Sequence, residues 1–333
     1  MKKHYDEIDI LKGIAIFLVV VGHGVILYPV NLHNVILTSR IYEWVESVHM
    51  PLFFLLAGFT FSYHEGYWRK KAKRILVPYL AFCLLDILLK STLPMLVNKQ
   101  KPLTEHIYDV FCGGGGYWFL YVLMVFYLVS PVLLLLVRKL SILRLLWFPV
   151  ALCLPFVPGI PEIFLLRLTA HYAPYFAAGV VVRYYVDRHA GINESSVRQE
   201  TDRLHSGQYY FLAMIVLGLW AVIKFGNGTA IYTVLYVLGA FSGILFFYLL
   251  VRSGFFRPVE QFLKDWGKLS LQIYLLDSYL LVVSRTLICR VLGEGQAFWI
   301  LLFNVVFDLG GALLLIHFVL GKAKVLKFLS GML

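Results

Sequence analysis

Residues 8–28 read IDILKGIAIFLVVVGHGVILY, an apolar run that is interrupted by one acid, one lysine and one histidine. The run is long enough to cross the hydrocarbon core of a bilayer, which takes about 20 residues in helical form. Further apolar runs follow at roughly 48–64, 75–97, 116–137, 141–157, 170–186, 209–224, 229–250, 268–292 and 297–320. The pattern predicts an all-α integral membrane protein, a bundle of about ten transmembrane helices.

The composition excludes the other broad classes of protein. The chain has 333 residues, of which 60% are hydrophobic and 15% are charged, and its mean hydropathy is +0.78. Soluble chains are about a quarter charged, so a soluble enzyme, a disordered chain and a disulfide framework are all excluded. The four cysteines show no metal-type spacing, and no metal site is predicted. We expect a single transmembrane domain over residues 1–333.

The basic residues predict which loops face the cytoplasm. If ten helices alternate with both termini inside, 22 of the 30 Lys and Arg residues fall on the inner side and 8 on the outer side, Arg285 among the latter. Cytoplasmic loops collect Lys and Arg, so this split indicates cytoplasmic termini in a multi-pass protein of the cell membrane. It also accounts for the net charge of +11, and no nucleic-acid partner is expected. Three early acids argue against a cleaved signal peptide: Asp6, Glu7 and Asp9.

The first predicted helix carries its polar residues on one face. Lys12 and His23 are 11 residues apart, which places them about 20° from eclipsed and about 16.5 Å apart along the axis. Asp9 falls within about 40° of His23 on the same side. Two interpretations stay open. The lysine can extend to the membrane surface while the histidine bonds to a neighbouring helix, or both can face a functional interior of the bundle.

Polar residues also recur in the later runs. His49 stands at the start of the second run, just before Pro51, at a depth that would let its imidazole share a pocket with His23. Three further stripes have near-helical spacing: Tyr79, Cys83, Asp86 and Lys90; Gly267, Ser270, Tyr274, Asp277 and Ser284; Asn304 and Asp308. Together they predict a polar interior, which a transporter and a membrane enzyme share. Each stripe alone is equally explained by hydrogen bonds between helices.

A dense basic segment, RKKAKR at residues 69–74, precedes the third predicted helix on the cytoplasmic side. Such a segment can orient the helix or contact anionic lipid. It can also hold a phosphate-rich cytosolic donor, because Lys and Arg suit phosphate groups. The glycines at 113–116 do not form a phosphate loop, because no Gly-Lys-Ser/Thr follows them.

Several segments together resemble one family of membrane proteins. Tyr5–His23 (YDEIDILKGIAIFLVVVGH) and His49–Phe61 (HMPLFFLLAGFTF) resemble the acyltransferase-3 family of membrane acyltransferases, the second in the form seen in its fucose 4-O-acetylase-like branch. Weaker matches follow in the family's order at Lys71–Tyr79 (KAKRILVPY), Tyr117–Leu120 (YWFL), Tyr175–Gly179 (YFAAG) and Gly267–Leu276 (GKLSLQIYLL). The resemblance covers nearly the whole chain and implies ten helices.

The resemblance implies transfer of an acyl group, usually acetyl from cytosolic acetyl-CoA, to a hydroxyl of an extracytoplasmic or lipid-linked glycan. Acetyl-CoA is then a co-substrate and no permanently bound cofactor is expected; the other partners are a glycan or glycolipid acceptor and membrane lipid. The family's basic residue and histidine of the first helix fall on Lys12 and His23, and its later basic pair falls on Lys71 and Arg74. The chain departs from the family where it has Lys12 for the usual arginine and Asp277 for a frequent histidine.

The expected site combines these residues. We expect His23 to act as general base on the acceptor hydroxyl, with His49 orienting it or binding the sugar. The donor-binding residues are expected to be Lys12, Asp9, Lys71 and Arg74, and the residues lining the acceptor cavity to be Trp118, Ser270, Tyr274 and Asp277. The alternatives are a transporter or flippase for a glycan, lipid or small anion, which would couple through Asp86, Asp277 and Asp308, and a scaffold bundle without chemistry.

Overall fold

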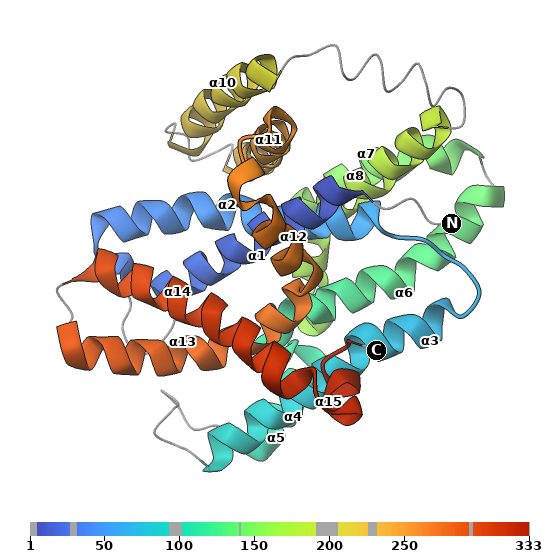
Figure 1. The fold of residues 1–333 in the computed structure, drawn as a ribbon. Helices are drawn as coiled ribbons and strands as arrows, with labels where there is room; N and C mark the ends of the chain where they lie inside the picture. Colours follow the sequence, from blue (N-terminus) through green and yellow to red (C-terminus); the bar gives the residue numbers. More distant parts are fainter. Residues whose placement is uncertain are drawn as a thin grey trace. The chain divides into compact units, whose positions relative to one another are not determined.

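The computed structural model describes residues 5–26, 32–92, 102–139, 141–190, 206–225, 232–292 and 296–332 (Figure 1). Every regular element in these residues is a helix, and no strand occurs among them, which confirms the all-helical prediction. The chain divides into two compact units, which are described in turn. The first comprises Met1–Thr60 and Ala178–Gly310, and the second comprises Phe61–Ala177 and Gly311–Leu333.

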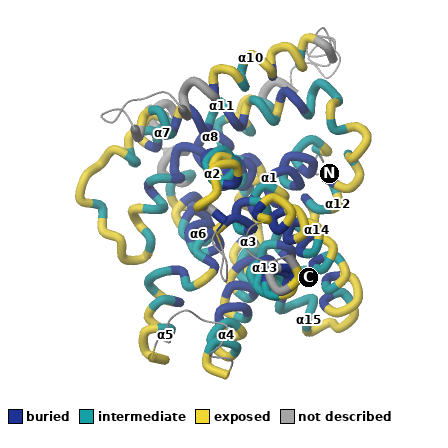
Figure 2. The backbone as a smooth tube through the Cα atoms, turned by 90° about the vertical axis from the view of Figure 1, so that its left-hand side faces the viewer, coloured by how far each residue is buried: buried dark blue, intermediate teal, exposed yellow. Residues whose placement is uncertain are grey.

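Helix α1 (Asp6–Ile26) is the buried centre of the first unit. Apolar side chains occur all around it, which is the pattern of a helix enclosed by others. Its neighbours are α2 (Ile36–Phe59), α11 (Tyr232–Ser253), α12 (Glu260–Lys268) and α13 (Ser270–Leu292). Figure 2 shows buried backbone along most of α1, whereas α10 (Ser206–Phe225) is largely exposed.

Two glycines bring α1 and α12 into backbone contact. A Cβ on Gly13 of α1 would overlap the carbonyl oxygen of Leu263 in α12. A Cβ on Gly267 of α12 would likewise overlap the carbonyl oxygen of Asp9 in α1. Small residues at helix interfaces allow such close approach in membrane proteins. The reciprocal pair therefore sets how α12 lies on the amino-terminal half of α1.

The remaining packing of the first unit joins α10 to α11 and α11 to α2. Ala213, Leu249 and Leu250 are buried where α10 meets α11. Residues Ala297–Gly310 of α14 (Ala297–Leu315) also belong to this unit. The side chain of Leu301 in this part of α14 lies 2.9 Å from the position that a Cβ on Gly24 of α1 would take. Helix α14 therefore approaches the carboxyl-terminal end of α1.

Helix α2 begins twelve residues before the predicted start at 48 and ends at Phe59, before the predicted end at 64. The predicted bounds are wrong because the first half of α2 carries charges, among them Arg40 and Glu43. The hydropathy pattern marks only the apolar part of a helix. The helix itself extends as far as its backbone hydrogen bonds continue, which can include charged residues. The amino-terminal half of α2 is thus a polar extension of an apolar segment.

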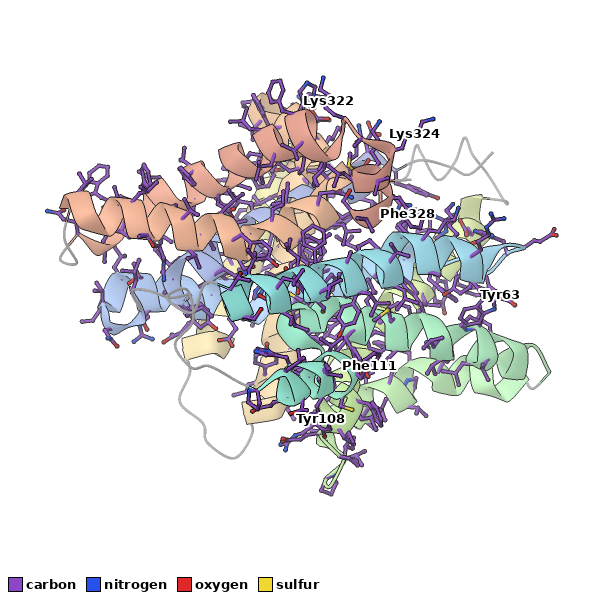
Figure 3. The ribbon with its side chains drawn as sticks, turned by 90° about the horizontal axis from the view of Figure 1, so that it is seen from below. Tyr63, Tyr108, Phe111, Lys322, Lys324 and Phe328 are labelled. Carbon is purple, nitrogen blue, oxygen red and sulfur yellow. The ribbon has the colours of Figure 1, made fainter. Side chains whose placement is uncertain are left out.

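The second unit begins with α3 (Tyr67–Lys71), which continues through a π-helical turn (Ala72–Leu76) into α4 (Val77–Thr92). The other helices of this unit are α5 (Leu103–Cys112), α6 (Trp118–Lys139), α7 (Ser141–Cys153), α8 (Leu166–Ala190) up to Ala177, and α15 (Lys324–Leu329). Figure 3 shows Tyr108 and Phe111 projecting from α5, Lys322 just before α15 and Lys324 at its start. Exposed aromatic and basic side chains of this kind are typical of a membrane–water interface.

Within the described residues, six stretches are long and apolar enough to cross a membrane: Asp6–Ile26, Tyr67–Thr92, Leu103–Leu134, Val234–Ser253, Ser270–Ile288 and Ala297–Leu320. Each of the ten predicted ranges overlaps a helix, but α2, α7, α8 and α10 are not among the six. They are shorter, more polar or interrupted. The protein is therefore a helical membrane protein, and ten spans with cytoplasmic termini remain a prediction.

Candidate active site

The imidazole of His23 is paired with a carboxylate. His23 lies near the end of α1, and its Nδ1 bonds to Oδ2 of Asp277 on α13, a helix that packs on α1. Asp277 is 1% exposed, whereas 29% of the His23 side chain is exposed. A carboxylate only accepts, so Nδ1 carries a proton and Nε2 is the nitrogen that faces away from Asp277. The pair therefore presents an oriented imidazole at a partly open position.

A second histidine faces the same region. Nδ1 of His49 on α2 donates to the carbonyl of Val45 at 2.7 Å, which fixes its tautomer and leaves Nε2 as an acceptor. His49 is close enough to His23 for the two rings to interact electrostatically. The structure thus brings together the two imidazoles that the sequence placed at similar depth.

Further buried polar side chains lie on α13 and α14. Asp308 of α14 lies next to Asp277. Ser284 of α13 donates to Oδ1 of Asn304 of α14 at 2.8 Å. Arg285 of α13 donates to a backbone carbonyl of α1. All of these side chains are almost fully buried. Polar side chains inside a membrane bundle occur in such mutually bonded sets.

Arg285 is a buried basic residue. Its side chain is 0% exposed and its guanidinium bonds to the carbonyl of Gly24. Gly24 lies in the last turn of α1, where backbone carbonyls lack helical partners. No local signal marks Arg285, because a charge near the end of an apolar run looks the same whether it points out of the bundle or into it.

The expected donor-binding residues of α1 lie toward its other end. Asp9 is buried and Lys12 is partly buried. On α13, Ser270 and Tyr274 are partly buried two turns and one turn before Asp277, respectively, on the same helix face. Gln272 of the same helix is 4% exposed and lies outside the predicted polar stripe.

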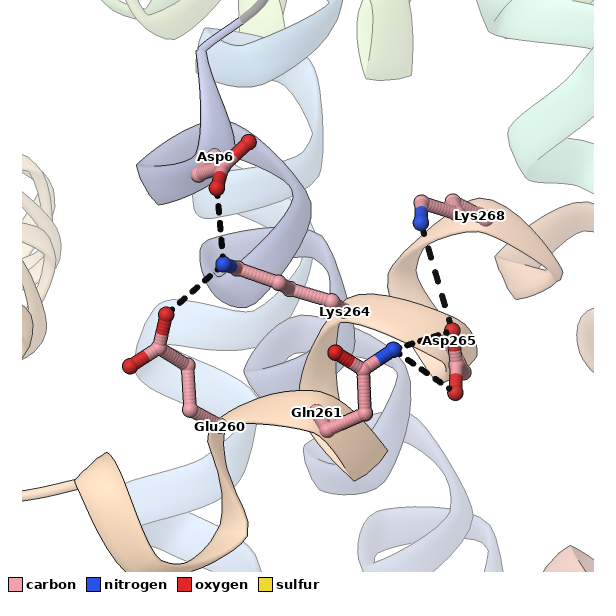
Figure 4. A network of polar contacts seen from close by, with 6 residues as sticks. All are labelled: Asp6, Glu260, Gln261, Lys264, Asp265 and Lys268. Carbon is pink, nitrogen blue, oxygen red and sulfur yellow. Dashed lines mark hydrogen bonds and ion pairs between the residues drawn. The ribbon is translucent and has the colours of Figure 1, made fainter.

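The first turn of α1 is tied to α12 by charges, as Figure 4 shows. Lys264 bridges Asp6 and Glu260, each at 2.7 Å. Because its ammonium donates to Asp6 and to Glu260, the pKa of Lys264 is raised above its usual range. Asp6 is 61% exposed, and exposed pairs contribute little, about 0–1 kcal/mol. The network orients the start of α1 and is not itself part of the site.

The other predicted site residues belong to the second unit. Lys71 places its ammonium 3.4 Å from the centre of the Tyr127 ring, and Arg74 is exposed in the π-helical turn that follows. Trp118 stacks on Tyr172 with ring centres 5.6 Å apart. Lys71 is thus held on the ring of Tyr127, and the exposed Arg74 is near enough to Tyr127 to interact with it electrostatically.

An aromatic anchor holds the basic segment. The hydroxyl of Tyr67 donates to the carbonyl of Tyr127 at 2.9 Å. That carbonyl lies four residues before Pro131, which has no N–H to bond it. The ring of Tyr127 receives the ammonium of Lys71. Tyr67, Lys71 and Tyr127 form what we call the α3 anchor. Residue spacing does not predict it, because it depends on a contact between separate helices.

Among the described residues, no group of His, Cys, Asp and Glu side chains could hold a metal ion. The site offers an imidazole backed by a carboxylate, an arrangement suited to proton transfer with a hydroxyl.

Comparison with known proteins identifies the class of chemistry. The sequence model of the acyltransferase-3 family, described as an acyltransferase domain, matches residues 5–319. The chain belongs to the acyltransferase-3 family. This acyltransferase is also similar to nodulation protein NolL of Mesorhizobium japonicum, with 28% identity over 133 residues, which are 38% of this chain and 35% of that protein. The matched stretch thus spans about a third of the relative. No solved structure matches the acyltransferase.

Proposed function

We propose that this acyltransferase is a multi-pass O-acetyltransferase of the cell membrane. It moves an acetyl group from cytosolic acetyl-CoA to a hydroxyl of an extracytoplasmic or lipid-linked glycan. The single observation that supports this best is the His23–Asp277 pair, because an imidazole oriented by a buried carboxylate is the base that acyl transfer to a hydroxyl needs. Membership of the family supports the class of reaction.

The proposed step uses Nε2 of His23. It takes the proton of the acceptor hydroxyl while the hydroxyl oxygen forms a bond to the carbonyl carbon of the thioester. The carbon–sulfur bond breaks, and the proton passes from the imidazolium to the departing CoA thiolate. Asp277 keeps Nδ1 protonated and stabilises the positive ring. General-base catalysis of this kind contributes about 10²–10⁴-fold to the rate.

The remaining residues bind the substrates in this proposal. Lys71 and Arg74 would meet the phosphates of acetyl-CoA from the cytoplasmic side, with Lys12 and Asp9 assisting. His49 would accept a hydrogen bond from the sugar at Nε2. The residues proposed to contact the acceptor are Trp118, Ser270 and Tyr274.

The test compares variants of the purified full-length protein in detergent, with release of free CoA thiol as the readout. His23→Ala should lower acetyl-CoA turnover by about 10²-fold or more, and Asp277→Asn should lower kcat with a smaller effect on the KM of acetyl-CoA. Asp86→Asn is the matched control, because Asp86 pairs with Lys90 in the second unit. Full turnover by well-folded His23→Ala protein would exclude the proposed role. Absence of any acetyl-CoA consumption by the wild type would favour the transporter alternative.

A further inference from the structure

A second carboxyl group, to which the proposed acetyl transfer gives no role, lies beside the His23–Asp277 pair. It belongs to Asp308 of α14, next to Asp277 of α13. Asp308 is 0% exposed and Asp277 is 1% exposed. Both residues belong to the first unit and lie in stretches long and apolar enough to span the membrane. Two acids therefore meet in a place that is almost closed to solvent.

The register of α13 and α14 brings these acids together. Only four residues separate the two helices, and helices joined by so short a connection run antiparallel. Ser284 of α13 donates to Oδ1 of Asn304 of α14 at 2.8 Å. Asp277 lies two turns before Ser284 and Asp308 lies one turn after Asn304, each on the same helix face as that residue. In an antiparallel pair both steps lead in the same direction, so the two carboxyl groups face each other.

Three oxygens of the two acids lack a hydrogen-bond donor. Oδ2 of Asp277 accepts from His23. Oδ1 of Asp277 and both oxygens of Asp308 have no partner in the part of the chain that the structure describes, although buried polar atoms nearly always have one. Two ionised carboxylates only accept and repel each other. A proton between them turns this contact into a hydrogen bond to a charged acceptor, which is a strong bond.

The surrounding charges indicate which acid holds the proton. Asp277 accepts from the N–H of His23, which stabilises its negative charge. None of the ion pairs between described residues includes Asp308. The guanidinium of Arg285 on α13 donates to the carbonyl of Gly24. An ionised carboxyl without a cation is unfavourable inside a membrane, so the proton belongs on Asp308.

We infer that Asp308 is a positioning residue whose protonated carboxyl donates a hydrogen bond to the carboxylate of Asp277 and so fixes the oxygen that faces His23. The inference rests on the proposed acetyl transfer, because it gives Asp308 a task in that reaction. The proton of Asp308 stays between the two acids during turnover, and the proton of the acceptor hydroxyl passes through His23 alone. The reaction therefore needs a neutral donor at position 308 and no negative charge there.

The first test separates a neutral donor from a negative charge. Asp308→Asn keeps a donor of the same shape without a charge, and Asp308→Leu removes the donor at similar volume. In purified full-length protein, Asp308→Leu should lower kcat about tenfold or more with little change in the KM of acetyl-CoA. Asp308→Asn should keep a kcat about tenfold above that of Asp308→Leu. Equal losses of kcat in these two variants would overturn the inference.

The matched control makes the same two changes at Asp86, which pairs with Lys90 in the second unit. Asp86→Asn and Asp86→Leu should not differ in kcat, because both remove the same ion pair outside the proposed site. A tenfold difference between them would show that the leucine substitution itself is harmful, and the result at position 308 would then count against the inference.

The second test observes the proton and does not require turnover or a folded Asp308→Leu variant. The full-length protein carries aspartate labelled with ¹³C at the side-chain carboxyl, and solid-state NMR in lipid nanodiscs near neutral pH distinguishes protonated from ionised carboxyl groups. The signal that disappears in Asp308→Asn should be that of a protonated group, and the one that disappears in Asp86→Asn that of an ionised group. An ionised Asp308 would overturn the inference.

A bound cation is the rival explanation for the facing acids. Among the described residues, no group of His, Cys, Asp and Glu side chains could hold a metal ion. Replacement of sodium by choline in the buffer should therefore leave the Asp308 signal in place, and a shift of that signal would overturn the inference. Absence of acetyl-CoA consumption by the wild type would refute the proposed function and with it the task of Asp308, whereas an ionised Asp308 in an active enzyme would refute this inference alone.

Discussion

The buried guanidinium of Arg285 donates to the carbonyl oxygen of Gly24, the residue that follows His23. Arg285 lies on α13, eight residues after Asp277. Helix α13 therefore holds the end of α1 at two neighbouring points, through the ring of His23 and through the backbone beside it. We therefore propose Arg285 as a positioning residue, because its guanidinium holds the backbone next to His23.

We expect Arg285→Met to lower the free energy of unfolding by about 1.5–3 kcal/mol, because a hydrogen bond from a charged donor is lost in a buried place. It should also lower kcat more than it changes the KM of acetyl-CoA. Thermal unfolding in detergent and steady-state kinetics measure the two effects. Arg167→Met is the control, because Arg167 is 73% exposed and its contact with Glu162 is long, 3.4 Å. Equal losses of stability and of kcat in the two variants would contradict the assignment of Arg285 as a positioning residue.

Gly13→Ala should destabilise the protein by about 1–3 kcal/mol, because the added methyl overlaps the backbone of Leu263, which cannot rotate away. Gly218→Ala is the matched control in α10. Nothing lies within 4 Å of the added methyl there, so removal of a helical glycine should stabilise by about 0.5–1 kcal/mol. Opposite signs of the two melting-temperature shifts are the expected result. A neutral Gly13→Ala would mean that α12 does not pack closely on α1.

The α3 anchor predicts coupling between Tyr67 and Pro131. Tyr67→Phe should lower the free energy of unfolding by about 0.5–1.5 kcal/mol, because the carbonyl of Tyr127 loses its hydrogen-bond donor. In Pro131→Ala protein the new N–H of residue 131 can bond that carbonyl instead. The double variant should therefore lose less stability than the sum of the two single changes, and a double-mutant cycle on thermal unfolding measures the difference. Strict additivity would show that the hydroxyl does not replace the missing helical bond.

Lys71→Ala should raise the KM of acetyl-CoA by about tenfold or more with little change in kcat, if its ammonium meets a phosphate of the donor. Lys73→Ala is the matched control. It removes one charge from the same cytoplasmic segment, and so has the same effect on orientation in the membrane, but Lys73 is exposed and has no role in the proposed site. Equal KM changes in the two variants would show a general charge effect. Orientation is checked by protease accessibility of both variants.

The hydropathy pattern predicted where helices occur, because an apolar run must form its backbone hydrogen bonds internally within a bilayer. Each predicted range overlaps a helix. The pattern missed α5, α12 and the first half of α2, which are short or charged. Amphipathic and polar helices are stabilised by the neighbours on which they pack, and hydropathy does not report those neighbours.

The candidate site likewise has some features that residue spacing predicts and others that depend on how the helices pack. Spacing placed Asp9, Lys12 and His23 on one face of α1 and put Asp277 in a stripe on α13, because helical geometry relates residues within one helix. The bond between His23 and Asp277, 254 positions apart, follows from no spacing rule. Residue order thus specifies the helices, their polar faces and the family. The pairing of histidine with carboxylate, the burial of Arg285 and the contact of Asp277 with Asp308 depend on how separate helices pack, since each requires groups from different helices to meet.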